Sequence, residues 1–143
     1  MNSVAKIADM LGGKTILGRE PASLHELRQQ VSEGLPKRSL THMVRRVSAD
    51  PKAQRAMMHR IVPEATFKRR HDRLSAAESE KTERIARIAT LAFGIWGEED
   101  GRAFLAHPHP MLGGETPLEA AATELGGREV ETILRAIEFG LPV

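Results

Sequence analysis

Apolar residues recur along this chain at intervals of three and four positions, the spacing that places side chains on one face of an α-helix. The longest such stretch predicts a helix over residues 76–96, with Ile85, Ile88, Ala89, Ala92 and Trp96 on that face. Shorter stretches predict helices after residues 23, 36, 50, 62, 97 and 116, and a final helix around residues 130–137. No stretch alternates apolar and polar positions with β-branched enrichment, so the pattern predicts an all-α fold.

The predicted helix ends have their own sequence signals. Three starts show a Ser or Thr followed three residues later by Glu, the spacing of a capping box: Ser23 with Glu26, Ser75 with Glu78, and Thr116 with Glu119. Asp50 precedes Pro51, a further cap-then-proline start. Glycines are predicted to end four helices, at Gly34, Gly97, Gly126-Gly127 and Gly140.

These signals divide the chain into three segments. Residues 1–22 contain Gly12, Gly13, Gly18 and Pro21, so we predict a loosely ordered N-terminal segment in which only residues 4–11 have a helical pattern. Residues 23–74 and residues 75–143 each hold several predicted helices, and we interpret them as two small domains.

Charge separates these two domains. Residues 36–73 contain 11 Lys and Arg against 3 Asp and Glu, whereas residues 81–143 contain 6 against 10. A concentrated basic segment is typical of a protein that binds a polyanion, although an ordinary solvated basic face has the same composition.

Composition excludes several kinds of site. The 143 residues include no cysteine, which rules out disulfides, thiolate catalysis and Cys-ligated zinc, and which fits a reducing cytoplasm. No apolar run is long enough to cross a membrane, and residues 1–17 lack the apolar core of a signal peptide.

No catalytic, metal or cofactor site is predicted. Ser23, Ser75 and Thr116 are better explained as helix caps than as nucleophiles. His107 and His109 flank a proline and have no third ligand nearby in sequence. We therefore predict a protein that is not an enzyme, and a small hydrolase is the least favoured class.

The predicted helices over residues 51–61 and 63–73 look like a helix-turn-helix. The second helix is short and basic, and Phe67 is expected to point inward as its anchor. Arg and Lys on such a helix contact guanine edges and phosphates in the major groove. The predicted DNA-binding residues are Glu64, Thr66, Lys68, Arg69, Arg70 and Arg73. The alternative is a basic surface helix without this role.

Several strings in the second half resemble the Xre/MbcA/ParS family of antitoxins. The helix start at residues 74–80, the segment Phe104 to Gly114, the string Thr116-Pro117-Leu118 and the closing residues 126–140 follow the order and spacing of that family. The resemblance covers about residues 60–143, and residues 1–20 lie outside it. This chain has Phe104 where the family usually has Trp, His109 where it usually has Asn, and no glycine at the turn near Ile61.

The resemblance implies a type II antitoxin with an Xre-like helix-turn-helix and a C-terminal helical toxin-binding domain. The implied partner is a RES-domain toxin that consumes NAD. The resemblance also implies that an antitoxin dimer holds this toxin in a hetero-oligomer and blocks it by occluding its NAD site. The helix-turn-helix is implied to bind the antitoxin's own promoter DNA and to repress transcription from it. The implied toxin-binding residues are Phe104, Leu105, Pro108, Leu112, Gly113, Gly114, Phe139, Gly140, Leu141, Pro142 and Val143. The alternative function is a stand-alone helix-turn-helix regulator whose C-terminal half dimerises.

Overall fold

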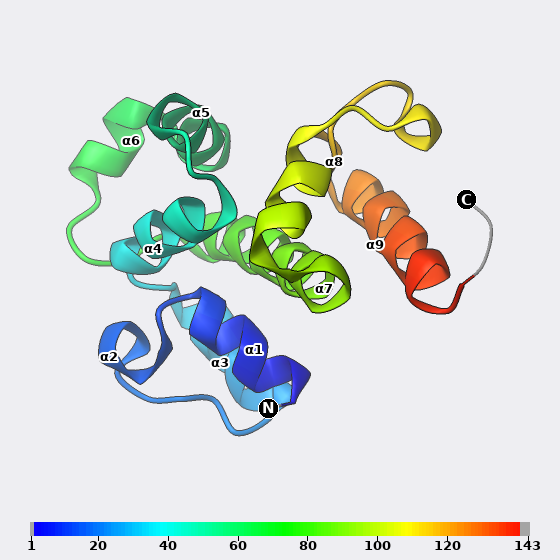
Figure 1. Cartoon of the computed structure of the whole chain (residues 1–143). Coiled ribbons are helices and arrows are strands. Elements are labelled where there is room, and N and C mark those ends of the chain that lie inside the picture. The colour runs from blue at the N-terminus through cyan, green and yellow to red at the C-terminus, as the bar shows by residue number, and fades with distance from the viewer. Residues whose placement is uncertain (1, 141–143) are drawn as a thin grey trace. The chain divides into compact units, whose positions relative to one another are not determined.

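Capping side chains and glycines set the helix ends in the computed structural model, which describes residues 2–140 (Figure 1). Within that range the helices are α1 (Ser3–Met10), α2 (Gly13–Leu17), α3 (Leu24–Glu33), α4 (Lys37–Val47), α5 (Pro51–Ile61), α6 (Glu64–Arg69), α7 (Ala76–Ala106), the 3-10 helix η1 (Pro110–Leu112), α8 (Pro117–Ala120) and α9 (Glu124–Glu138). Among residues 2–140 the one β-type pairing is an isolated bridge between Pro36 and Arg73. The all-α prediction is confirmed.

The three predicted capping signals all act at helix starts. Ser75 Oγ accepts from the Glu78 backbone N–H at 3.1 Å, and Glu78 Oε1 accepts from the Ser75 N–H at 2.7 Å. Thr116 and Glu119 make the same reciprocal pair. At Ser23 the geometry differs, because the Glu26 carboxylate accepts from the backbone N–H of Ala22, one residue before the cap.

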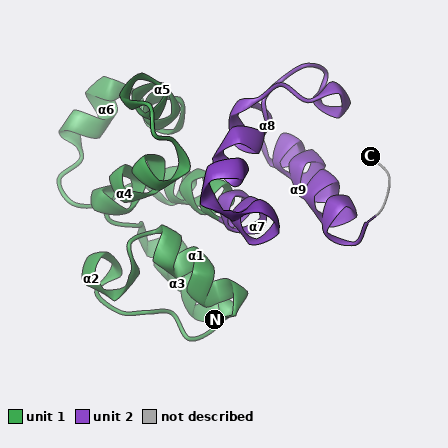
Figure 2. Cartoon of the chain, in the orientation of Figure 1, with its two compact units in different colours: residues 1–86 green, residues 87–143 purple. Residues whose placement is uncertain are grey.

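The chain divides into two compact units, residues 1–86 and residues 87–143, and the division falls inside α7 (Figure 2). It therefore lies beyond the predicted boundary at residues 74 and 75. The reason is that the first turns of α7 belong to the first unit. Ser79 is fully buried there, and its Oγ accepts from the Leu35 backbone N–H at 2.8 Å. The Ser75 capping box marks the start of a helix and not the start of a domain.

Residues 2–22 contain two helices, whereas the prediction was a loosely ordered segment over residues 1–22. The apolar face of α1 and the residue that follows it are buried in the first unit, through Ile7, Ala8, Met10 and Leu11. α1 contacts α3 and α4, and α2 contacts α4. Gly12 is an αL N-cap of α2 (φ 108°), so the glycines that suggested disorder instead allow a tight turn between two helices.

This packing gives a stability prediction at Leu11. Leu11 is completely buried, so Leu11→Ala should lower the free energy of unfolding by about 2–5 kcal/mol. Urea denaturation followed by circular dichroism would measure it, with Lys6→Ala on the exposed side of α1 as the control. A Leu11→Ala effect as small as that of the control would contradict the assignment of α1 to the core.

In the second unit, glycines serve two different purposes. Gly97 has φ 86° and ψ 176°, which breaks the helical path of α7 where the sequence predicted a helix stop. The predicted stop at Gly126-Gly127 is wrong, because both residues lie inside α9 and are buried. A Cβ on Gly126 would overlap the Ala120 carbonyl oxygen, so this glycine permits close approach of α8 and α9.

Candidate functional site

The helices α5 and α6 of the first unit are joined by Val62 and Pro63. Asp50 caps the start of α5, where its carboxylate accepts from two backbone N–H groups, and Pro51 takes the first helical position. α5 ends at Ile61, and its C-cap residue Val62 is completely buried and extended. The proline that follows has no N–H to continue α5, and it precedes the first residue of α6.

α6 presents most of its side chains to solvent. Glu64, Lys68 and Arg69 are exposed, and Thr66 is half-buried. Lys68 Nζ lies 3.4 Å from Glu64 Oε1, and Arg69 Nη2 donates to Thr66 Oγ1 at 3.4 Å. Four of the predicted DNA-binding residues therefore lie on this one turn-and-a-half of helix.

Lys37, at the start of α4, holds α6 in place. Its ammonium group lies 4.2 Å from the ring centroid of Phe67 and donates to the Arg70 backbone carbonyl at 2.9 Å. A cation at this position is favourable because the carbonyl groups at a helix C-terminus carry partial negative charge. Phe67, which was predicted to be an inward anchor, is half-buried beneath this cation.

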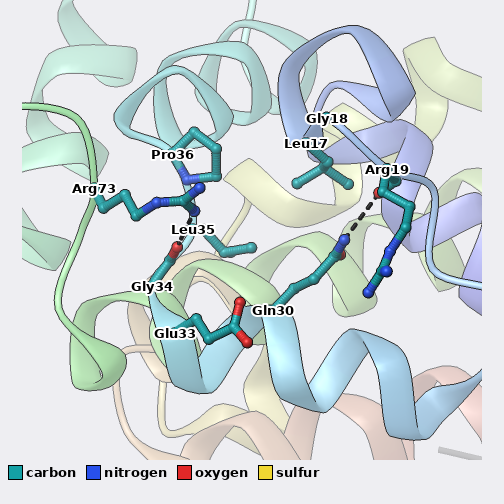
Figure 3. Close-up of a pocket in the computed structure, with 9 residues that line it drawn as sticks. All are labelled: Leu17, Gly18, Arg19, Gln30, Glu33, Gly34, Leu35, Pro36 and Arg73. Atoms are coloured by element: carbon teal, nitrogen blue, oxygen red, sulfur yellow. Dashed lines mark hydrogen bonds between the residues drawn. The ribbon is translucent and has the colours of Figure 1, made fainter.

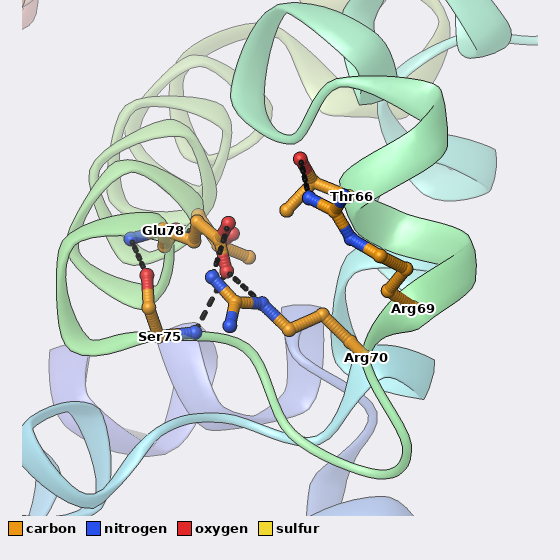
Figure 4. A network of polar contacts seen from close by, with 6 residues as sticks. Thr66, Arg69, Arg70, Ser75 and Glu78 are labelled. Carbon is orange, nitrogen blue, oxygen red and sulfur yellow. Dashed lines mark hydrogen bonds and ion pairs between the residues drawn. The ribbon is translucent and has the colours of Figure 1, made fainter.

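α6 ends at Arg69, four residues earlier than the predicted helix. Arg70 is extended, and its guanidinium donates to both carboxylate oxygens of Glu78 at 3.2 and 3.1 Å (Figure 4). The same carboxylate caps α7 through Ser75. The pairing competes with a further helical turn, because it draws Arg70 toward the start of α7. This short network therefore ties the C-terminal end of α6 to α7.

Arg73 is also engaged within the protein. Its Nη1 donates to the Gly34 backbone carbonyl at 2.8 Å, across 39 positions of the chain. Gly34 has φ 100°, and a Cβ there would overlap the Leu74 carbonyl oxygen. Of the six predicted DNA-binding residues, Arg70 and Arg73 thus make intramolecular contacts that fix the segment after α6.

The Glu78 network predicts an acid-sensitive contribution to stability. Burial by itself raises the pKa of the Glu78 carboxyl, but hydrogen bonds from Arg70 and Ser75 outweigh it, so the pKa lies below its ordinary value of 4.5. A carboxyl whose pKa is lower in the folded state stabilises that state above about pH 4.5, and the contribution is lost as pH falls through the folded pKa. Glu78→Gln should lower the unfolding free energy by about 1–2 kcal/mol at pH 7.

Urea denaturation at pH 7, 5, 4 and 3 would test this. The difference between the parent chain and Glu78→Gln should shrink as the pH falls below 4.5. Glu80→Gln, two residues along α7 and exposed, is the matched control. A difference that stays constant across the pH series would show that the ionised carboxylate does not carry the effect.

α5 carries further basic side chains, which are not among the predicted DNA-binding residues. Lys52, Arg55 and Arg60 are exposed on α5, which contains no acidic residue. The excess of basic residues over 36–73 was the available signal. The sequence pattern points to the second helix alone, because it predicts an apolar stripe on α5 that includes Ala53 and Ala56. Both of these alanines are exposed in the structure.

In the second unit an aromatic cluster supports the loop that follows α7. The Trp96 and Phe104 ring centroids lie 4.7 Å apart, and the His109 ring meets Phe104 edge-on at 6.2 Å. His109 Nδ1 also accepts from the Met111 backbone N–H at 3.1 Å. Gly113 and Gly114 both have positive φ, which completes the turn before α8.

The predicted toxin-binding residues fall into three groups. Leu105 and Leu112 are buried in the core of the second unit, so their side chains do not reach the surface. Phe104 is half-buried, while the exposed residues are Pro108, Gly113, Gly114, Phe139 and Gly140. The remaining predicted residues, Leu141, Pro142 and Val143, lie outside the described part of the chain.

The C-terminal end of α9 forms an exposed surface. A shallow groove along it is lined by Arg128, Glu131, Thr132, Arg135, Ala136 and Phe139, and Phe139 is 71% exposed. Leu125, at the other end of α9, is 70% exposed, and Met111 is 55% exposed on η1, which contacts α9. Met111 and Leu125 were not predicted, because single apolar residues in a helical pattern do not reveal whether they face the core.

The described residues were also compared with the requirements of a metal site and of a membrane-spanning helix. No group of three His, Asp or Glu side chains within residues 2–140 is placed to hold a metal ion. No helix in that range is both long and apolar enough to cross a membrane.

Two models of known protein families match this chain, one in each unit. Residues 26–87 match a family model described as the antitoxin Xre-like helix-turn-helix domain, and residues 91–140 match one described as the antitoxin Xre/MbcA/ParS C-terminal toxin-binding domain. A Pseudomonas putida protein named antitoxin Xre is 28% identical over 125 residues, which cover 85% of this chain and 76% of that protein. The N-terminal helices α1 and α2 precede both matched regions.

Proposed function

Since the chain belongs to the Xre/MbcA/ParS family of antitoxins, we propose that it neutralises a RES-domain, NAD-consuming toxin and represses its own promoter. The second unit binds the toxin and occludes its NAD site. The first unit binds DNA through α6, with α5 beside it. The chain itself contributes no chemistry to either activity.

The observation that carries the toxin-binding role is the exposed aromatic side chain of Phe139 in an acidic unit. Residues 87–143 contain 4 Lys and Arg against 9 Asp and Glu. A cleft that binds a dinucleotide is basic, so an acidic partner complements it. Aromatic side chains, Phe among them, are enriched in the cores of protein interfaces. Phe139 is followed by Gly140, Leu141, Pro142 and Val143, which are also among the predicted toxin-binding residues.

The DNA-binding role has independent support in the first unit. Residues 1–86 contain 17 Lys and Arg against 10 Asp and Glu. α6 is held at its C-terminal end by Lys37 and by the Arg70–Glu78 pair, while Lys68 and Arg69 remain exposed. We infer that Lys68, Arg69 and Thr66 contact DNA, and that Arg70 and Arg73 position α6 and the segment after it.

Co-expression tests the proposal. The gene product encoded next to this chain would be expressed alone and with it, and bacterial growth and intracellular NAD would be measured. The neighbour alone should stop growth and deplete NAD, and this chain should restore both. Growth arrest without NAD loss would contradict the NAD-consuming toxin, and a harmless neighbour would favour the stand-alone regulator.

A further inference from the structure

Lys37 occupies a position that its own helix disfavours. It is the first residue of α4, and the first turn of α4 contains no acidic residue. A cation there meets the partial positive charge of the helix N-terminus, which favours acidic side chains. The reason for a lysine at this position therefore lies in its contacts with other parts of the first unit.

Lys37 contacts the end of α6 and the segment that follows it. Its ammonium group donates to the Arg70 carbonyl at 2.9 Å and lies 4.2 Å from the Phe67 ring centroid. Its backbone N–H donates to the Asp72 carbonyl at 2.9 Å. The positive charge is favourable here, because the carbonyl groups at a helix C-terminus and the face of an aromatic ring are both partially negative.

The linker between α3 and α4 fixes the point from which Lys37 reaches α6. The Leu74 backbone N–H donates to the Leu35 carbonyl at 2.8 Å. Arg73 Nη1 donates to the Gly34 carbonyl at 2.8 Å (Figure 3). These two bonds tie the residues just before α4 to the residues that follow α6. The backbone of Lys37 is thus held beside the end of α6 independently of its side chain.

α6 depends on such contacts for its orientation. It has six residues, and a helix so short is not stable through its own hydrogen bonds. Its half-buried Phe67 lies beneath the Lys37 ammonium group, and Arg70, the residue after the helix, pairs with Glu78. The direction in which exposed side chains such as Lys68 point follows from how this inner face is held.

We propose, on the basis of the proposed DNA-binding function of α6, that Lys37 is a positioning residue for promoter recognition. Its ammonium group holds α6 at the angle at which the exposed side chains of that helix meet base edges. Lys37 itself does not contact DNA, since its ammonium group is directed toward the Arg70 carbonyl and the Phe67 ring. Base contacts require a fixed geometry, whereas attraction to phosphates follows charge. Lys37 therefore sets sequence specificity and contributes little to general affinity for DNA.

Anisotropy titrations of the full-length chain with promoter DNA and with random-sequence DNA of the same length test the proposal. Lys37→Met keeps an unbranched side chain and removes both contacts of the ammonium group. It should weaken promoter binding at least about tenfold, because only molecules with α6 correctly oriented bind specifically. Random DNA should bind within about twofold of the parent, and the slope of log K against log salt should not change.

Three further variants separate positioning from charge and from folding. Arg38→Met removes the same charge from the neighbouring exposed position, so it should keep the parental ratio of promoter to random binding. Lys37→Arg retains a cation and should recover most of the promoter affinity. Phe67→Leu keeps an apolar anchor but removes the ring beneath the ammonium group, and it should lower the same ratio. Circular dichroism would give the unfolding temperature of each variant, and the titrations would be made below it.

The outcomes distinguish this role from the DNA-binding function on which it depends. A parent chain that binds promoter and random DNA equally would contradict the DNA-binding function itself. If the parent discriminates and both Lys37→Met and Phe67→Leu discriminate equally well, the positioning role is wrong. Equal weakening on both DNAs with a flatter salt slope would make Lys37 a phosphate contact and would also overturn the proposal.

Discussion

Phe139→Glu should abolish neutralisation of the toxin while leaving the antitoxin folded and able to bind DNA. The side chain is 71% exposed, so its replacement should change the free energy of unfolding by no more than about 0.5 kcal/mol. In the proposed complex the ring is buried against the toxin. Removing such an aromatic anchor costs at least about 2 kcal/mol of binding free energy, or about a thirtyfold loss of affinity.

Bacterial growth under co-expression and calorimetric titration of purified toxin would both measure this effect. Leu24→Glu is the matched control, because Leu24 is also 71% exposed but lies on α3 in the first unit. The control should neutralise the toxin as the parent does. If Phe139→Glu retains parental affinity, the end of α9 is not the toxin-binding surface and the proposed interface fails.

The C-terminal residues extend the same test. Deleting Leu141, Pro142 and Val143 should weaken inhibition of the toxin, because we propose that these apolar residues occupy the NAD site. Inhibition should fall more than binding, since Phe139 remains in the truncated chain. Full inhibition by the truncated chain would place the occluding residues elsewhere.

The double substitution Lys68→Glu with Arg69→Glu should abolish promoter binding while toxin neutralisation persists. Both side chains are exposed on α6, and the Lys68–Glu64 ion pair is a surface pair that adds little to stability. Each lost contact to a base or phosphate costs about 1–3 kcal/mol, so the pair should reduce affinity at least about thirtyfold. The dependence of log K on log salt should flatten by about one for each phosphate contact removed.

Electrophoretic mobility shift or anisotropy titrations at several salt concentrations would measure both effects. Lys14→Glu with Arg28→Glu changes the net charge of the first unit equally, and both residues are exposed outside α5 and α6. That control should lose much less affinity. Equal losses in the two double variants would mean that binding responds to overall charge and that α6 does not read DNA.

Local signals determined much of this protein from sequence. The Asp50-Pro51 start, the Ser75–Glu78 and Thr116–Glu119 capping boxes and the break at Gly97 all formed as predicted, because each depends on residues within one helical turn. The all-α class and the contrast between a basic first half and an acidic second half follow from the same local reading. The motifs that resemble the Xre/MbcA/ParS family likewise lie in continuous stretches of the sequence.

Only the tertiary structure decided which of these residues reach a partner. Gly12 has the local pattern of a loosely ordered segment, yet it forms the tight turn between α1 and α2. Gly126 has the local pattern of a helix stop, yet it lies inside α9 and allows α8 to approach that helix closely. Leu105 and Leu112 are core residues, whereas Phe139 and Leu125 are exposed, although all four are large apolar residues. Arg70 and Arg73 look like DNA contacts in a basic string, but Glu78 and the Gly34 carbonyl hold them. In each case the deciding neighbour lies on another element, and local patterns carry no information about contacts that only folding brings together.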